Sequence, residues 1–227
     1  MTISFIANYF TKLYNNFEVI ILNKSNYVDI IDILKKTYPN AKCSLNFNKP
    51  FELVVAVMLS AQCTDERVNK TTPALFSKYP TIESFANANI TELEKMIHPC
   101  GFYKNKAKNI IETAKKVLSD FDGIVPSNME DLLTLPGVGR KSANVIMLEV
   151  FDIAQGIAVD THCKRISNRL GLSKESDPTK IELDLIKKFP LETLKDVNHL
   201  FIYFGRDICT ARNPKCEQCP LRNFCKL

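Results

Sequence analysis

The sequence predicts an all-α fold, and three observations support this prediction. Apolar residues recur at helical spacing along most of the chain, as in residues 27–38, where Val28, Ile31 and Leu34 share one face. The breaks between such segments coincide with proline and glycine. The segment FELVVAVMLSA at 51–61 has the valines of a strand, but no segment of similar quality offers it a partner, so we expect a buried helix there.

The expected helices, in chain order, are 27–38, 51–61, 64–78, 90–98, 103–119, 129–134, 139–151, 161–170, 178–188 and 192–204. The breaks that bound them fall at Pro39, Pro50, Pro80, Pro99 to Gly101, Asp122 and Gly123, Pro136 and Gly137, Gly156 and Gly171. No repeat, linker or Gly/Ser tract separates domains. Any arrangement in two domains therefore has to be compact and helical.

The composition is that of a soluble globular protein. Of the 227 residues, 45% are hydrophobic and 24% are charged, and no segment is of low complexity. A chain of this length forms one large domain or two small ones. Its formal net charge of +5 permits a polyanionic partner without requiring one.

The first 25 residues lack the basic leader and the small-residue cleavage site of an export signal. Their longest apolar run, 19–22, is far too short to span a membrane, so we expect a cytoplasmic protein with no membrane partner. An additional amphipathic helix, to which we assign no function, is predicted there by apolar residues at helical spacing, namely Phe5, Ile6, Tyr9, Phe10 and Leu13.

The stretch LPGVGRKSANV at 135–145 contains two of the chain's seven glycines, Gly137 and Gly139. A short helix is expected before the turn and an apolar helix after it, with Gly139 letting the chain reverse without a Cβ in the way. Free backbone N–H groups and the positive end of the second helix then form an anion site suited to a phosphate. We therefore expect Gly137, Gly139 and Arg140 to contact a nucleic-acid backbone, although an αα-corner that only packs has the same glycine pattern.

Lys141 lies within the first turn of the second helix, where the helix dipole and the neighbouring Arg140 disfavour its ammonium form. A neutral amine beside a DNA backbone is a nucleophile that can attack the sugar C1′, displace a base and form a Schiff base. The Schiff base in turn eases elimination of the adjoining 3′ phosphate. We therefore predict that Lys141 is catalytic.

A carboxylate is expected near this amine, because the sugar gains positive charge as the base leaves. The stretch AVDTHCKRISNRLGL at 158–172 offers Asp160, which we predict stabilises that charge and transfers a proton. Asp160 also precedes a helix that starts at Thr161, where it is a good N-cap. The two roles are compatible.

Four of the eight cysteines crowd into the last nineteen residues, with six, two and five residues between neighbours: Cys209, Cys216, Cys219 and Cys225. In the reducing compartment that we expect, a metal site is favoured over disulfides. The spacing alone leaves zinc and iron–sulfur open, and the single Cys-x2-Cys pair, where zinc ribbons have two, favours a structural [4Fe–4S] cluster.

Basic residues lie between these cysteines, and we expect Arg212 and Lys215 to reach phosphates from a loop that the metal holds in place. The remaining cysteines are scattered among apolar or helical surroundings. We predict that these four, Cys43, Cys63, Cys100 and Cys163, are inert buried thiols.

Taken together, these stretches resemble the endonuclease III family of helix–hairpin–helix DNA glycosylases. The resemblance spans about residues 27–227 in the family's order, and it is carried by SAQCTD (60–65), CGFYKNKA (100–107), LPGVGRKSANV (135–145), AVDTH (158–162) and the four terminal cysteines. It implies a helix–hairpin–helix glycosylase fold with two helical lobes and a C-terminal [4Fe–4S] loop. One lobe is a six-helix barrel domain of 43–154, and the other, made of 1–42 plus 155–227, holds the cluster, with DNA across the groove between them.

The resemblance also implies a bifunctional DNA glycosylase and abasic-site lyase of base excision repair. Lys141 matches the family's Schiff-base lysine and Asp160 its essential aspartate. The implied substrates are oxidised pyrimidines in duplex DNA, and the implied partner is double-stranded DNA with damaged pyrimidines or abasic sites. We expect a monomer associated with the nucleoid.

Flipping a damaged base out of the duplex leaves a gap, which enzymes of this kind fill with an inserted side chain. Gln62 matches the family's position that fills the gap and faces the orphaned base. Phe102 stands where the family usually has a smaller aliphatic wedge, often leucine, and Ser142 where threonine is common.

Two other functions remain open on the sequence. A monofunctional relative, such as an adenine glycosylase acting at mismatches, shares the fold, hairpin and cluster. That branch lacks a lysine at the hairpin position and usually carries an extra C-terminal domain, whereas this chain has Lys141 and ends just after Cys225. A noncatalytic DNA-binding module would use the hairpin and cluster only to grip phosphate and would form no covalent adduct.

Overall fold

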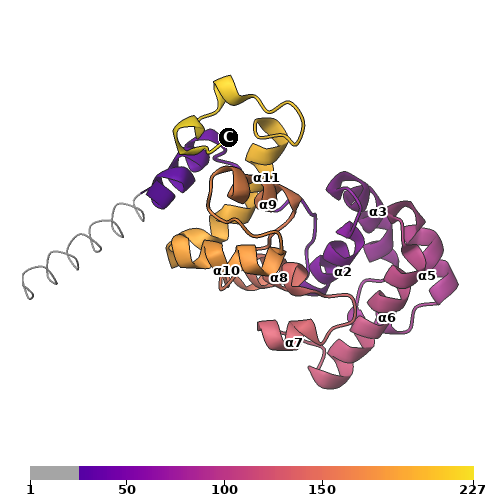
Figure 1. Ribbon diagram of the computed structural model, residues 1–227. Coiled ribbons are helices and arrows are strands. Elements are labelled where there is room, and N and C mark those ends of the chain that lie inside the picture. The colour runs from indigo at the N-terminus through magenta and orange to yellow at the C-terminus, as the bar shows by residue number, and fades with distance from the viewer. Residues whose placement is uncertain (1–25) are drawn as a thin grey trace, which may run out of the picture. The chain divides into compact units, whose positions relative to one another are not determined.

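The computed structural model describes residues 26–227, which contain helices and no strand (Figure 1). This confirms the all-α prediction for the described part of the chain. The amphipathic helix predicted within the first 25 residues lies outside it. Among the described residues, no helix combines the length and the apolar character that a membrane span needs.

Residues 26–37 are helical. The later α-helices are α2 (Pro50–Ser60), α3 (Asp65–Lys78), α4 (Ile82–Ala86), α5 (Ile90–Ile97), α6 (Tyr103–Asp120), α7 (Met129–Leu133), α8 (Arg140–Phe151), α9 (Thr161–Arg169), α10 (Pro178–Lys188) and α11 (Leu194–Asp207). Short 3₁₀ helices follow or precede some of these: η1 (His98–Cys100), η2 (Leu191–Thr193), η3 (Cys216–Gln218) and η4 (Arg222–Phe224). Every predicted helix in this part of the chain is present, whereas α4, only five residues long, was not predicted.

The valine-rich segment 51–61 is helical, as predicted, because α2 is buried on all sides. Residues 51–59 are all buried, so no polar face is needed and the sequence shows no helical period. The helix begins at Pro50, and the Glu52 carboxylate accepts hydrogen bonds from the backbone N–H groups of Asn48 and Lys49, at 2.7 and 3.3 Å.

The chain divides into two compact units, each described by itself. One unit is Lys42–Ala158, and the other consists of the described residues before Lys42 together with Val159–Leu227. The division into a six-helix barrel domain of 43–154 and an iron–sulfur cluster domain of 1–42 plus 155–227 stays a prediction.

In the Lys42–Ala158 unit, α2 packs against α3, α6 and α8, and α6 also packs against α4 and α5. Its core contains many fully buried apolar side chains, with Leu53, Phe85, Leu93 and Ile110 among the largest. The hairpin of α7 and α8 packs on this core through its own turn, which holds it close to α2.

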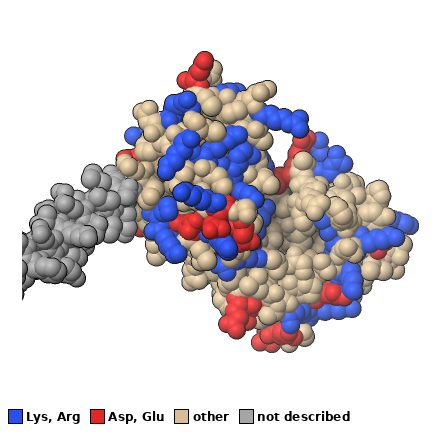
Figure 2. All heavy atoms as spheres, in the orientation of Figure 1, with Lys and Arg blue, Asp and Glu red and all other residues tan. Residues whose placement is uncertain are grey.

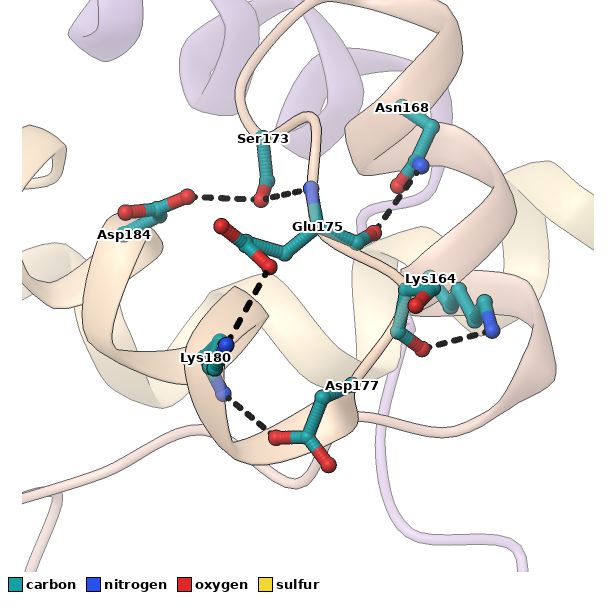
Figure 3. Close-up of polar contacts among 8 residues, drawn as sticks. Lys164, Asn168, Ser173, Glu175, Asp177, Lys180 and Asp184 are labelled. Carbon is teal, nitrogen blue, oxygen red and sulfur yellow. Dashed lines mark hydrogen bonds and ion pairs between the residues drawn. The ribbon is translucent and has the colours of Figure 1, made fainter.

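In the second unit, α9 packs against α10 and α11. Figure 3 shows the hydrogen bonds that hold the loop from α9 to α10. The buried Ser173 hydroxyl donates to Asp184 Oδ2 at 2.7 Å and accepts from the Glu175 N–H at 3.1 Å. Lys164 and Asn168 of α9 donate to the carbonyls of Ser176 and Glu175, at 2.7 and 3.1 Å. The loop therefore fixes the direction of α9.

We expect Ser173→Ala to lower the free energy of unfolding by about 1–2 kcal/mol, because it removes one partner from the Asp184 carboxylate and one from the Glu175 N–H. Ser176→Ala is the matched control, since the exposed Ser176 holds Lys164 through its backbone carbonyl, which the substitution keeps. Chemical denaturation of both variants checks this. Equal losses would show that the Ser173 hydroxyl does not hold the loop.

Candidate active site and nucleic-acid interface

The predicted hairpin of α7 and α8 is present, and its turn is held by buried side chains and by a hydrogen bond from α6. Asn128 caps α7, since its Oδ1 accepts the Asp131 N–H at 2.9 Å. Within the turn, Leu135 and Val138 are buried, and the Pro136 carbonyl accepts from the Thr113 hydroxyl of α6 at 2.8 Å. The turn is thus held in one conformation before any partner approaches.

The two glycines of the turn are required for different reasons. Gly137 has φ +79°, and a Cβ there would lie 2.7 Å from Asn109 Nδ2 and 3.1 Å from Met58 Cε. Gly139 has φ −97° and ψ 176°, an extended backbone open to any residue, and a Cβ there would meet no atom within 4 Å. The expectation that Gly139 enables the chain reversal is therefore wrong, since Gly137 makes the turn. A Cβ at Gly139 would instead project into open space.

Gly139 is also the N-cap of α8, so no side chain caps the first turn of that helix. The N–H groups of a first helical turn have no partner within the helix and favour an anion. Lys141, the second residue of α8, is exposed at this end. About one turn further along α8, Asn144 is buried, and its Nδ2 donates to the Ile157 carbonyl at 3.3 Å. An amine and an anion-binding helix end therefore lie together on one surface.

Asp160 is the N-cap of α9, because its Oδ1 accepts the Cys163 N–H at 2.7 Å. The capping role is thus present, and it fixes the orientation of a carboxylate that is only half-buried. The neighbouring His162 has its pKa lowered by burial, an effect that Arg165 and Arg206 reinforce and the Asp160 charge opposes. Lys141 and Asp160 belong to different units, and their pairing stays a prediction.

Gln62 and Phe102 lie in two left-handed turns of the Lys42–Ala158 unit. Gln62 follows α2 and has φ +54°, and Phe102 precedes α6 and has φ +48°. Both side chains are exposed, and Phe102, at 64%, is among the most exposed large apolar residues described. Phe102 is thus not a core aromatic, and its ring is available to a partner.

Lys106, which no sequence motif singled out, is only 6% exposed. Its Nζ donates to the carbonyls of Leu59, Ala61 and Cys100 at 2.8, 2.8 and 2.9 Å. A signal was available, because Lys106 precedes the buried Ala107 and stands four residues before the buried Ile110, within the apolar stripe of α6.

The four C-terminal cysteines line one small cavity together with Phe204 of α11 and with Leu170 and Ile208, the C-cap residues of α9 and α11. Two arginines of α9 donate hydrogen bonds to Cys209 and Thr210, where this loop begins. Arg165 Nε donates to the Cys209 carbonyl at 3.0 Å, and Arg169 donates to the Thr210 carbonyl at 2.8 Å and to Cys209 Sγ at 3.3 Å. The sequence analysis did not identify either arginine.

The four thiols surround one cavity that is otherwise lined by apolar and basic residues. In a [4Fe–4S] cluster each cysteine binds a different iron, so four thiols around one cavity fit that group.

The other four cysteines differ in burial. Cys100 and Cys163 are buried, and burial raises the pKa of both thiols. Cys43 is half-buried, with its pKa raised by burial to about 11, and Cys63 is also half-buried. The prediction that all four are buried is therefore wrong for Cys43 and Cys63, which lie nearer to the surface.

Figure 2 shows Lys and Arg side chains over much of the visible face, with Asp and Glu in smaller groups. Arg212 and Lys215 are both exposed in the cysteine loop. Lys215 forms an ion pair with Asp207 at 3.1 Å, and Asp207 also accepts from the Tyr38 hydroxyl at 3.0 Å. Such an exposed pair contributes little, so a phosphate can compete with Asp207 for Lys215.

Comparison with known proteins gives consistent matches. Residues 55–191 match the family model "HhH-GPD superfamily base excision DNA repair protein", and residues 209–225 match "Iron-sulfur binding domain of endonuclease III". Endonuclease III of Synechocystis sp. is 51% identical over 202 residues, covering 89% of this chain and 92% of the relative. Endonuclease III of Bacillus subtilis is 43% identical over 206 residues, covering 90% and 94%.

Similar solved structures also include those of endonuclease III proteins. A non-covalent Endonuclease III–DNA complex has a TM-score of 0.85 at 41% identity, covering 89% of this chain and 95% of that one. A trapped Endonuclease III–DNA covalent intermediate matches with the same values. The glycosylase fold implied by the sequence resemblance is therefore confirmed.

Serine substitutions at the two glycines are expected to separate their roles. Gly137→Ser should lower the free energy of unfolding by about 2 kcal/mol or more, because the left-handed backbone and the contacts with Asn109 and Met58 exclude a Cβ. Gly139→Ser should change it by only a few tenths of a kcal/mol, since serine is a good N-cap and its Cβ meets no protein atom. Thermal unfolding of the pair checks this, and similar losses would contradict it.

Proposed function

Because the chain belongs to the endonuclease III family of the HhH-GPD superfamily of base excision DNA repair proteins, we propose that it removes oxidised pyrimidines from duplex DNA and cleaves the strand at the resulting abasic site. The observation that carries the proposal is the exposed Lys141 in the first turn of α8, beside a glycine N-cap that leaves room for a phosphate.

In the proposed reaction, the Lys141 amine attacks C1′ of the flipped nucleotide. The new C1′–N bond forms as the glycosidic bond breaks, and the base leaves with the electron pair and takes up a proton. Opening of the sugar gives a Schiff base between Lys141 and C1′. Loss of a C2′ proton then expels the 3′ phosphate, and water finally releases the enzyme.

Asp160 is proposed to stabilise the positive charge that develops on the sugar and to take part in proton transfer. Its carboxylate is held in position by the Cys163 N–H at 2.7 Å, so little reorganisation is needed when the charge appears. A capping aspartate is therefore suited to this role, because the same hydrogen bond that starts α9 also orients the catalytic group.

The remaining site residues are proposed to hold the DNA. The turn at Gly137 and Gly139, with Arg140, binds a phosphate through backbone N–H groups and the end of α8. Gln62 and Phe102 enter the gap left by the flipped base. Gly139→Ser, whose hydroxyl would occupy the first-turn N–H groups, is then expected to bind duplex DNA more weakly than its near-native stability suggests.

We propose that Cys209, Cys216, Cys219 and Cys225 hold a [4Fe–4S] cluster. When bound, the cluster pins the loop that carries Arg212 and Lys215, and these side chains then meet the DNA backbone with less ordering cost. For the protein as a whole, we propose a cytoplasmic location close to the chromosome.

Lys141→Gln should abolish trapping of the enzyme on duplex DNA containing thymine glycol in the presence of borohydride, because the glutamine amide forms no Schiff base. Asp160→Asn should slow base release but still allow trapping on a preformed abasic site, where no base has to leave. Gel analysis of the trapped complex checks both variants. Base release without trapping by the wild type would indicate the monofunctional alternative, and binding without either reaction a noncatalytic module.

Cys216→Ser should reduce the broad absorbance near 400 nm that an iron–sulfur cluster gives, because it removes one proposed ligand. Cys43→Ser, in the other unit, is the matched control and should keep that absorbance. Spectra of the purified proteins, with iron and zinc analysis, check this. A colourless wild type containing zinc would contradict the cluster assignment.

A further inference from the structure

Lys106 is an unusual residue for a helical core. Lysine is almost never fully buried unless it is paired, and here only 6% of the residue is exposed. The acceptors of its three N–H bonds are backbone carbonyls rather than carboxylates. Burial lowers the pKa of Lys106, which the nearby Cys63 and Cys100 thiols oppose. Burying an ammonium group costs free energy even when all its hydrogen bonds are made, so the position of Lys106 calls for a further explanation.

The three carbonyls lie directly beside the two left-handed turns. Leu59 lies in the last turn of α2, and Ala61 is the C-cap that immediately precedes Gln62. Cys100 ends η1, two residues before Phe102. The Phe102 carbonyl also accepts the Lys106 N–H at 3.1 Å. Lys106 is thus hydrogen-bonded to the backbone next to Gln62 and to the backbone at and before Phe102.

The two exposed side chains receive little support from packing. Gln62 is exposed and Phe102 is 64% exposed, so their positions depend on the backbone that carries them. That backbone is strained, because neither glutamine nor phenylalanine favours a positive φ. Strained turns persist only when the surroundings hold them, and the Lys106 ammonium donates to the backbone beside each of the two turns, at Ala61 and at Cys100.

We propose that Lys106 is a positioning residue that holds the turns of Gln62 and Phe102 at the spacing needed for both side chains to enter the duplex together. This inference rests on the proposed function, since it takes Gln62 and Phe102 to fill the gap. It predicts that Lys106 matters for substrates in which a base must be extruded from a duplex, and not for the Schiff-base step itself.

The test compares borohydride trapping on two substrates: duplex DNA with thymine glycol, and a single strand with a preformed abasic site. Lys106→Met keeps an unbranched apolar stem, one atom shorter than lysine, and removes the three donors. We expect trapping on the duplex to slow by about tenfold or more and trapping on the single strand to change by less than about twofold. Lys115→Met is the matched control, since Lys115 is an exposed lysine of the same helix, and should leave both rates unchanged.

A double-mutant cycle with Gln62→Ala sharpens the test. If Lys106 acts through Gln62, the loss on the duplex caused by Lys106→Met should shrink in the Gln62→Ala background. Losses that multiply independently, equal slowing on both substrates, or no slowing on the duplex would overturn the proposal.

If Lys106→Met does not fold, Lys106→Gln replaces it, because the amide keeps two donors on a shorter side chain. An intermediate loss confined to the duplex supports the proposal, and an equal loss on both substrates overturns it. A wild type that forms no trapped complex on either DNA refutes the proposed function, and this inference with it. If the wild type is trapped on both DNAs and the Lys106 variant is slowed equally on both, only the role of Lys106 is refuted.

Discussion

Cationic side chains that donate to backbone carbonyls hold the irregular parts of this protein. An all-α fold leaves carbonyls without partners wherever a helix ends, and buried carbonyls must be bonded. Lys106 donates to carbonyls at the end of α2 and in η1. Arg165 and Arg169 donate to the carbonyls of Cys209 and Thr210, which follow α11. Hydrogen bonds from charged donors are the stronger kind, so a few side chains suffice to hold long loops.

This arrangement explains why the candidate site lies almost entirely at helix ends. Gln62 follows α2, Phe102 precedes α6, Lys141 starts α8 and Asp160 caps α9. A nucleic-acid backbone is a row of anions, and helix N-termini supply both N–H donors and a positive dipole. Side chains at these ends are also exposed without breaking the packing of the helix bodies. The helices therefore act as supports, and the chemistry depends on their termini.

Periodicity predicted most of the helices, and motifs supplied the candidate site residues, whose roles stay predictions. The features that the sequence did not predict have physical reasons. The five residues of α4 are too few to show a period, and its capping box of Thr81 and Ser84 is the local signal. Lys106 was hidden because charged residues are expected at the surface, although its place in the apolar stripe of α6 was visible. The ion pair of Lys215 with Asp207 depends on how the loop folds back, which spacing does not encode.

The turn of the hairpin shows how one motif can carry two unrelated constraints. A sequence pattern records only that positions 137 and 139 have no side chain, and the sequence alone led us to attribute the reversal of the chain to Gly139. In the structure, Gly137 is required by atoms inside the protein, namely Asn109 and Met58, whereas nothing inside the protein requires Gly139. A glycine that the fold does not need is costly, because it enlarges the conformational entropy of the unfolded chain. The space at Gly139 is therefore best explained by an external group, and it lies beside the first turn of α8, where Lys141 is exposed.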